Sequence, residues 1–269
     1  MATLQAALAD LRRLDELAAR DTRLTRLDPR AKLVTTFAFV LVVVSFERHA
    51  VAALLPLALF PIVLASMGEV PAAALLRKLA LAAPLALLVG LPNPWLERTP
   101  VLLFGETTLA AGWWSLASIL LRFVLTVGAA LVLVAGTGIT ALCAALAQLG
   151  VPRVFTVQLL FLYRYSFVLG AEAARLSTAR QLRSAGRRAS FASHGPLLGH
   201  LLLRAFGRAG RIHQAMVARG FDGELRNLRR WRWQPPDTCF VLGWCSVFAL
   251  LRSVDVPALM GRALLACCS

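Results

Sequence analysis

The sequence predicts an all-α polytopic membrane protein, and three observations support that fold class. First, 58% of its 269 residues are hydrophobic and only 16% are charged, whereas soluble domains are about half apolar and a quarter charged. Second, long apolar runs are separated by short polar connections. Third, a strongly basic stretch with helical patterning follows these runs. We therefore expect four to five transmembrane helices and, beyond them, long amphipathic helices.

The first four transmembrane helices are predicted from apolar runs at about 31–46, 50–66, 74–91 and 113–135. The second and third runs are short against the roughly 20 residues that a straight span needs, and both contain prolines that kink helices. Asp28 and Pro29 indicate the start of the first helix, since Asp is a favoured N-cap and Pro suits the first helical position. A fifth, shorter run from Cys239 to Leu251 follows two tryptophans, and we expect a fifth span there.

The distribution of basic residues predicts the orientation in the membrane. The formal net charge is +15, and arginine is abundant both before the first run and after residue 152. Because cytoplasmic loops carry the excess of positive charge, this pattern indicates topology rather than nucleic-acid binding. We expect a cytoplasmic N-terminal segment (1–30), transmembrane helices 1–4 (31–135), cytoplasmic helices (136–237), and a C-terminal transmembrane helix with a tail (238–269).

Two long basic helices are predicted within the 136–237 region. The first runs from Pro152 to about Ala185, and the second runs from Pro196 to Arg219. One interpretation of their arginines is contact with anionic lipid headgroups, at about 1 kcal/mol per residue near the surface. A sharper one starts from Arg183 and Arg219, which each lie in the last turn of a helix. Two such tips suit two equivalent acidic grooves on a dimeric partner, since arginine makes several directed bonds while staying charged.

The tetrapeptide Ala218-Arg219-Gly220-Phe221 also has a purely local interpretation. Gly220 is the residue type that a helix favours at its C′ position, where the backbone turns left-handed. Phe221 at C″ then folds back on Met216, and Arg219 lies favourably at the negative end of the helix dipole. The sequence therefore predicts a capped helix end that presents an arginine.

No set of catalytic or metal-ligating residues emerges. The sequence has no glycine-rich phosphate loop, zinc-ligand spacing or nucleophile elbow. We therefore expect no metal site, no cofactor and no enzymatic activity. The alternative is a membrane-embedded enzyme or scaffold whose basic face binds lipid headgroups. Arg122 is the one ionisable residue deep within an apolar run, and either a functional role or pairing inside the helix bundle fits it.

Several fragments, in order, resemble the T component of energy-coupling-factor importers, and the likeness covers most of the chain. They are Leu27-Asp28-Pro29-Arg30-Ala31-Lys32-Leu33, Arg122, Thr137, Thr140, the stretch 146–152, Leu182-Arg183-Ser184 and Ala218-Arg219-Gly220. The last two match the coupling signatures of that family, although the first of them has Leu182 where alanine is usual. The chain looks most like the CbiQ subtype, which serves cobalt or nickel uptake.

This resemblance implies a cytoplasmic coupling module of long crossed helices and a non-catalytic role. Two ATP-binding-cassette (ABC) ATPase subunits would dock at the helix tips, and a substrate-binding membrane subunit would pack on the apolar faces of the module. Membrane lipids complete the expected surroundings, in a bacterial inner membrane and in the service of cobalamin biosynthesis. The implied coupling residues are Arg183, Ser184, Ala218, Arg219 and Gly220, and the implied structural residues are Asp28, Pro29, Arg30, Lys32 and Arg122.

Overall fold

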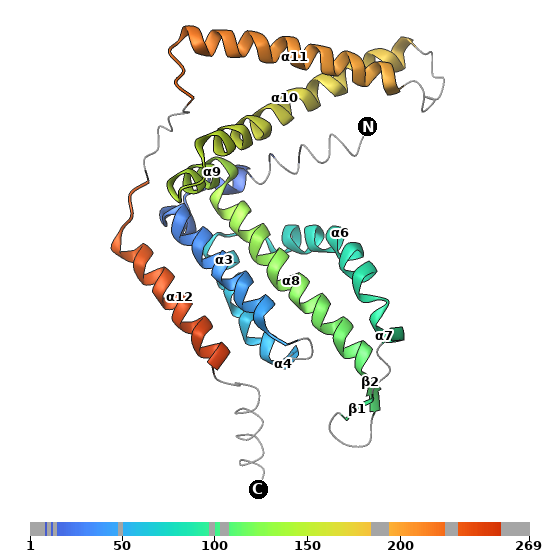
Figure 1. Ribbon diagram of the computed structural model, residues 1–269, viewed down its shortest axis with the longest axis vertical. Coiled ribbons are helices and arrows are strands. Elements are labelled where there is room, and N and C mark those ends of the chain that lie inside the picture. The colour runs from blue at the N-terminus through green and yellow to red at the C-terminus, as the bar shows by residue number, and fades with distance from the viewer. Residues whose placement is uncertain are drawn as a thin grey trace. The chain divides into compact units, whose positions relative to one another are not determined.

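The structure is a computed structural model that describes residues 9, 12, 15–47, 51–96, 100–102, 108–183, 194–223 and 231–253, most of them helical (Figure 1). The chain divides into two compact units. The bundle unit comprises residues 17–138 and 231–269, and the long-helix unit comprises residues 1–16 and 139–230. The predicted helical class is confirmed, with one small β-hairpin that the sequence did not indicate.

The elements of the bundle unit follow one another with short connections from α2 to α8, and α12 joins them after the long-helix unit. They are α2 (Arg23–Arg26), α3 (Pro29–Ser45), α4 (Val51–Leu54), η1 (Pro56–Ala58), α5 (Leu59–Met67), α6 (Ala72–Gly90), α7 (Asn93–Leu96), β1 (Pro100–Leu102), β2 (Thr108–Ala110), α8 (Ala111–Thr137) and α12 (Pro235–Ser253). The strands β1 and β2 pair antiparallel, with Val101 opposite Leu109. Pro56 falls where the second predicted run breaks into separate short helices, because proline cannot continue the hydrogen-bond ladder.

The start of α3 confirms the predicted cap. Asp28 has an extended backbone, and its side chain accepts a hydrogen bond from the Arg30 N–H at 2.9 Å. Pro29 occupies the first helical position, where its missing N–H costs no intrahelical bond. These two residues therefore fix where the first long helix begins.

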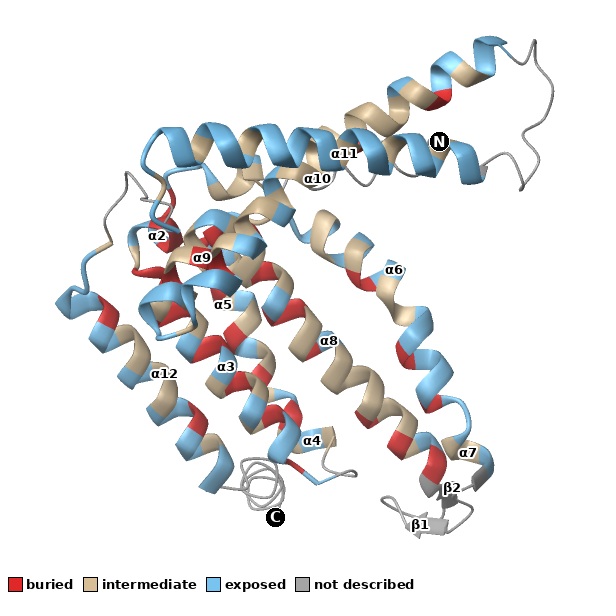
Figure 2. Cartoon of the chain, turned by 45° about the horizontal axis from the view of Figure 1, so that its top comes forward, coloured by how far each residue is buried: buried red, intermediate tan, exposed pale blue. Residues whose placement is uncertain are grey.

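The core of the bundle unit lies where α3, α5, α8 and α12 meet, and Figure 2 shows buried residues concentrated on their facing sides. Aromatic rings join three of these helices. The ring of Phe60 on α5 lies 4.6 Å from that of Phe39 on α3, and it meets Trp244 and Phe248 of α12 edge-on at 5.0 and 5.3 Å. Edge-to-face pairs at these separations add to the stabilisation from burial.

The long-helix unit contains α9 (Ile139–Gln148), α10 (Arg153–Arg183) and α11 (His194–Ala218). A glycine cap follows α9: Gly150 has φ +95°, and the Val151 N–H donates to the Leu146 carbonyl at 3.1 Å. Figure 2 shows α11 exposed along nearly its whole length. Its half-buried residues recur at helical spacing, at 197, 201, 205, 212 and 216. Only one stripe of α11 is therefore sheltered.

Three helical segments in the described part of the chain are long and apolar enough to cross a membrane. They are Ala72–Trp95, Gly112–Thr137 and Arg153–Arg183. The first two match predicted spans. The third is α10, which the sequence assigned to the cytoplasmic helices, whereas α3, α4 to α5 and α12 are shorter or less apolar. The count of four to five spans, like the predicted domain boundaries, stays a prediction.

We expect Phe60→Ala to destabilise the bundle unit by about 3 kcal/mol or more, because the side chain is fully enclosed and its removal leaves a cavity among three rings. The thermal unfolding midpoint of the purified protein in detergent measures this loss. Phe37→Ala is the matched control, since Phe37 lies on α3 and is 63% exposed. Equal shifts in the two variants would contradict the assigned core.

Candidate coupling site

The end of α11 is closed by a glycine cap of the predicted kind. Gly220 has φ +77°, and its N–H donates to the Val217 carbonyl at 2.9 Å. The Phe221 N–H donates to the Met216 carbonyl at 3.0 Å. These two bonds form a Schellman motif, which satisfies carbonyls that a helix end otherwise leaves without partners. Arg219 is exposed between them, so the cap prediction is confirmed and the arginine stands at the tip.

The end of α10 presents the second arginine. Arg183 is the last residue of the helix and is exposed, as is its neighbour Leu182. Ser184 of the first predicted motif lies outside the described residues. Because α11 returns along α10, Arg183 and Arg219 lie at opposite ends of the helix pair (Figure 1). The 25 residues of α11 alone span about 37 Å at 1.5 Å per residue.

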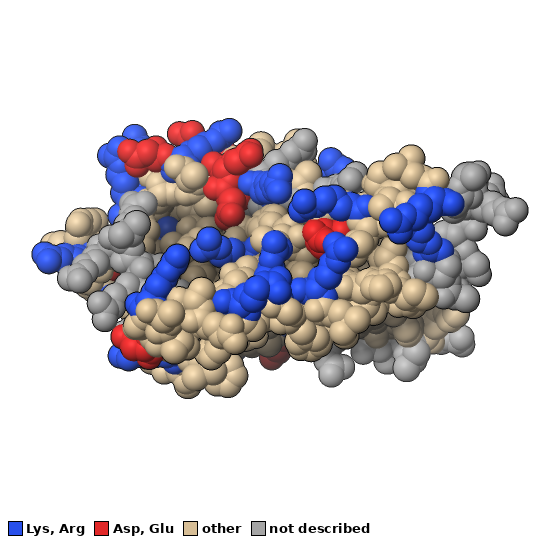
Figure 3. Space-filling view, turned by 90° about the horizontal axis from the view of Figure 1, so that it is seen from above, with Lys and Arg blue, Asp and Glu red and all other residues tan. Residues whose placement is uncertain are grey.

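One ion pair joins α10 to α11. Glu172 of α10 accepts a hydrogen bond from the Arg204 guanidinium of α11, and Arg175 lies 3.7 Å from the other carboxylate oxygen of Glu172. The Glu172 side chain is 20% exposed and Arg204 is 62% exposed, so water weakens the pair only in part. Around it the surface is strongly basic, as Figure 3 shows in the view onto these helices.

An apolar groove of about 380 Å³ runs between α10 and α11. Its floor and walls are mostly aliphatic and aromatic side chains, among them Phe161, Leu162, Leu202, Phe206 and Met216. Phe206 and Leu162 are 67% and 66% exposed, so the groove presents large apolar side chains to its surroundings. The sequence missed this groove as a specific surface, although the apolar stripe of the second helix was readable.

The N-terminal segment also contacts α10. The Arg12 guanidinium lies over the ring of Phe167, 5.8 Å from its centre, and Asp15 hydrogen-bonds to the Tyr163 hydroxyl. These contacts attach the described side chains of this segment to α10 within the long-helix unit.

The N-terminal motif is buried in the bundle unit. Asp28 and Lys32 are 2% and 1% exposed, and the Lys32 ammonium donates to the Leu24 carbonyl at 3.1 Å. Arg30 is half-buried, with its Nε 3.8 Å from an Asp28 carboxylate oxygen. Asp237, which sequence reasoning did not place in any site, accepts the Asp28 N–H at 2.8 Å. The motif therefore has a partner 209 residues further along the chain.

Arg122 pairs inside the bundle unit, but with backbone rather than with an acid. Its guanidinium donates to the carbonyls of Phe46, at 2.9 Å, and Glu47, both just beyond the end of α3. Arg252 of α12 reaches the same helix end, donating to Ser45 at 3.3 Å and lying 4.9 Å from the centre of the Phe46 ring. Pairing inside the helix bundle was one of the two roles that the sequence left open for Arg122, but the sequence does not show which backbone carbonyls it contacts.

The predicted residues thus fall into two groups. Arg183, Ala218, Arg219 and Gly220 lie in the long-helix unit, and Asp28 to Lys32 and Arg122 lie in the bundle unit. Among the described residues, no three His, Cys, Asp or Glu side chains gather in a way that would hold a metal ion. At the two helix tips the structure presents one exposed arginine side chain each, Arg183 and Arg219.

The sequence matches the family of CbiQ cobalt transport proteins over residues 21–230, more than half of the chain. The chain belongs to this family. It is 37% identical over 86 residues to the cobalt transport protein CbiQ of Rhodobacter capsulatus, covering 31% of this chain and 34% of that one. An uncharacterized protein of Methanocaldococcus jannaschii is 29% identical over 84 residues, covering 30% of this chain and 31% of that one.

Each alignment thus spans about a third of the curated relative. The CbiQ family match includes the N-terminal motif, Arg122 and both long helices, whereas Asp237 and α12 lie beyond it. Together with the apolar helices, membership in a cobalt transport family makes the chain a membrane protein of a transport system.

We expect Gly220→Ala to destabilise the end of α11 by about 1 kcal/mol, because a Cβ is strained at positive φ. Hydrogen exchange of the amides at 217–221 measures the fraying. Gly210→Ala is the matched control: Gly210 lies within the same helix with open space around it, so alanine there should be neutral or stabilising. Faster exchange at 217–221 in the control and not in Gly220→Ala would contradict the cap.

Proposed function

We propose that this chain is the transmembrane coupling subunit of an energy-coupling-factor importer, moving cobalt or nickel in support of cobalamin biosynthesis. The observation that carries the proposal is the pair of exposed arginines at opposite ends of two ion-paired helices, Arg183 on α10 and Arg219 after α11. Membership in a cobalt transport family supports it. The chain transmits motion and catalyses no reaction itself.

The two tips suit two ABC ATPase subunits. Each tip ends a long helix, so the arginine projects from a stiff support. The Schellman cap at Gly220 holds Arg219 in a defined place, and a planar guanidinium there forms directed bonds to carboxylates. Since the tips are far apart, each reaches a separate groove. A pair of identical ATPases offers two such grooves by symmetry.

Transmission then follows from a shift between two states. ATP binding draws the ATPase pair together, which pulls on both tips at once and changes the angle between α10 and α11. The Glu172–Arg204 ion pair joins these two helices, and we place the pivot of that change there. The movement reorients the membrane partner that carries the substrate.

The apolar groove between α10 and α11 suits the substrate-binding membrane subunit. Its lining is overwhelmingly apolar, and large side chains such as Phe206 and Leu202 stand 67% and 57% exposed. A hydrophobic helix of a partner would cover them in the way amphipathic helices fill grooves. Opening or closing of the α10–α11 angle would change this groove directly, which links the ATPase tips to the partner.

The remaining basic residues suit anionic lipid headgroups of the inner membrane. Arg208 and Arg211 line a second hollow beside Arg204, which adjoins the apolar groove at Arg208. Basic residues near such a surface contribute about 1 kcal/mol each. This placement agrees with the positive-inside orientation, which puts the N-terminus and the long helices on the cytoplasmic side.

We expect the double variant Arg183→Glu/Arg219→Glu to abolish co-purification with the ATPase subunits and the ATP hydrolysis that assembly stimulates, because both contacts become repulsive. Arg208→Glu/Arg211→Glu is the matched control, with the same change in net charge at positions away from the tips. Normal assembly and transport in the tip variant would refute the coupling role.

We expect Phe206→Asp to release the membrane partner while the ATPases stay bound, because it places a carboxylate in the apolar groove. Quantitative co-purification of each subunit separates the two effects. Phe155→Asp is the control, since Phe155 on α10 is 68% exposed but lies outside the groove lining. Equal loss of the partner in both variants would show that this groove is not its docking surface.

A further inference from the structure

The chain passes between its two units at three points, after residues 16, 138 and 230. Any motion of the long-helix unit reaches the bundle unit along these three connections. If each connection were free to move, motion of the long-helix unit would not be passed along the chain to the helices of the bundle unit. What holds the three connections inside the bundle unit therefore matters for transmission.

Asp237 links the segment that follows the third connection, after residue 230, to the segment that follows the first, after residue 16. One carboxylate oxygen accepts the backbone N–H of Asp28 at 2.8 Å, and the other accepts the N–H of Gln234 at 2.9 Å. Both acidic residues are 2% exposed. The single side chain of Asp237 thus accepts hydrogen bonds from backbone N–H groups at the starts of two helices, α3 and α12. Buried N–H groups at a helix start are costly when they lack such a partner.

Leu24 packs the segment that follows the first connection, after residue 16, against the segment that precedes the second, at residue 138. A Cβ on Gly136 of α8 would collide with the Leu24 side chain, which is fully buried, so the two segments pack as closely as glycine allows. Next to it, a Cβ on Gly138 would lie 3.0 Å from that of Ala18. The Lys32 ammonium donates to the Leu24 carbonyl at 3.1 Å and links this contact back to α3.

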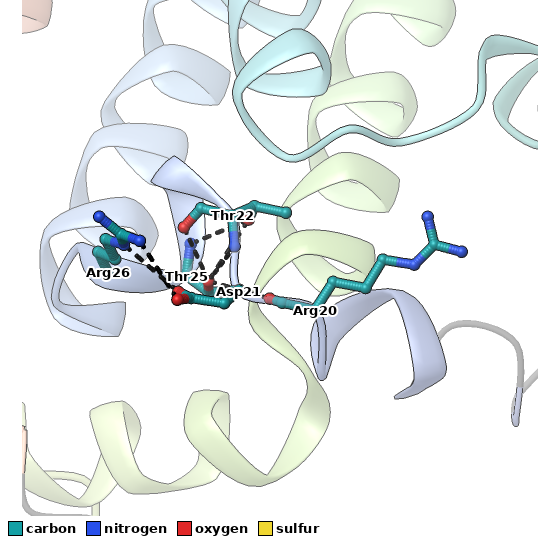
Figure 4. Close-up of polar contacts among 5 residues, drawn as sticks. All are labelled: Arg20, Asp21, Thr22, Thr25 and Arg26. Atoms are coloured by element: carbon teal, nitrogen blue, oxygen red, sulfur yellow. Dashed lines mark hydrogen bonds and ion pairs between the residues drawn. The ribbon is translucent and has the colours of Figure 1, made fainter.

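The short helix α2 that carries Leu24 is itself fixed by a capping box (Figure 4). The Thr22 N–H donates to the Thr25 hydroxyl oxygen at 2.8 Å, and the Thr25 N–H donates to the Thr22 hydroxyl oxygen at 3.3 Å. Both threonines are buried. Asp21 and Arg26 pair on the exposed side of the same turn, with 3.2 Å between their charged groups.

We propose that Leu24, Asp28, Gly136 and Asp237, here called the junction cluster, clamp the three connections into one body, and that Asp237 is a positioning residue for coupling. The proposal rests on the function proposed above. Because the clamp joins α3, α8 and α12, a pull on any connection displaces the transmembrane helices together. Without the junction cluster, movement of the ends of α10 and α11 would shift the three connections without displacing the helices of the bundle unit.

The clamp itself is tested on the purified chain by hydrogen exchange, independently of any transport partner. We expect Leu24→Ala to speed exchange about tenfold at the start of α3, at 134–138 and also at 234–237, because a single body loosens as a unit. Asp237→Asn should do the same, since an amide has one oxygen and cannot accept both N–H groups. Faster exchange confined to the neighbourhood of each substitution would overturn the clamp.

The coupling role is tested in the complete transporter by the metal ion taken up per ATP hydrolysed. We expect this ratio to fall about fivefold or more in Asp237→Asn, with complex yield near that of the unsubstituted protein, and to recover partly in Asp237→Glu, which keeps both oxygens. Asp21→Asn is the control, an exposed carboxylate in the same stretch of chain.

An unchanged ratio in Asp237→Asn, or uptake and hydrolysis falling in parallel, would show that the cluster only supports the fold. Failure of the proposed function looks different: the unsubstituted chain would then neither bind the ATPases nor stimulate them, while the exchange result on the isolated chain would stand.

Discussion

The bundle unit depends on how the two ends of α3 are satisfied. At its N-terminus the carboxylates of Asp28 and Asp237 accept backbone N–H groups, and at its C-terminus the guanidinium groups of Arg122 and Arg252 donate to backbone carbonyls. Negative charge at the start and positive charge at the end both favour the helix dipole, by about 1–2 kcal/mol each where partly buried. Backbone groups that are buried away from water need such partners, and here residues outside α3 supply them.

This arrangement divides mechanical roles between the units. Residues from α8 and α12 complete the ends of α3, and the Phe39, Phe60 and Phe248 rings fill the space between, so the bundle resists internal rearrangement. In the long-helix unit, no described residue of α11 is fully buried. A tightly packed body joined to a lightly packed helix pair suits the proposed transmission role, because interfaces that bury little surface change their angle at low cost.

Local signals were readable from the sequence, and long-range ones were not. Asp28 with Pro29 predicted the start of α3, and Gly220 with Phe221 predicted the cap of α11, because each rule involves neighbouring residues. Asp237 accepts a hydrogen bond from a backbone N–H 209 residues away. Because every residue except proline has a backbone N–H, no pattern of side chains in the sequence predicts which one Asp237 contacts. The partners of Arg122 could not be predicted for the same reason, since they are backbone carbonyls and every residue has one.

The distances from the proposed pivot to the ends of α10 and α11 determine how far each end moves when the angle between the helices changes. Eleven residues separate Glu172 from Arg183 and fifteen separate Arg204 from Arg219, so the two arms measure about 16 and 22 Å at 1.5 Å per residue. A change of about 10° in the angle between the helices would then move the Arg219 tip by about 4 Å, a displacement on the scale of known switching motions. The groove lies along the α11 arm and along the part of α10 that precedes Glu172, residues 158–169, so it would open or close as the Arg219 tip moves. Because both arms are single uninterrupted helices, little of that motion is lost to bending before it reaches the apolar surface.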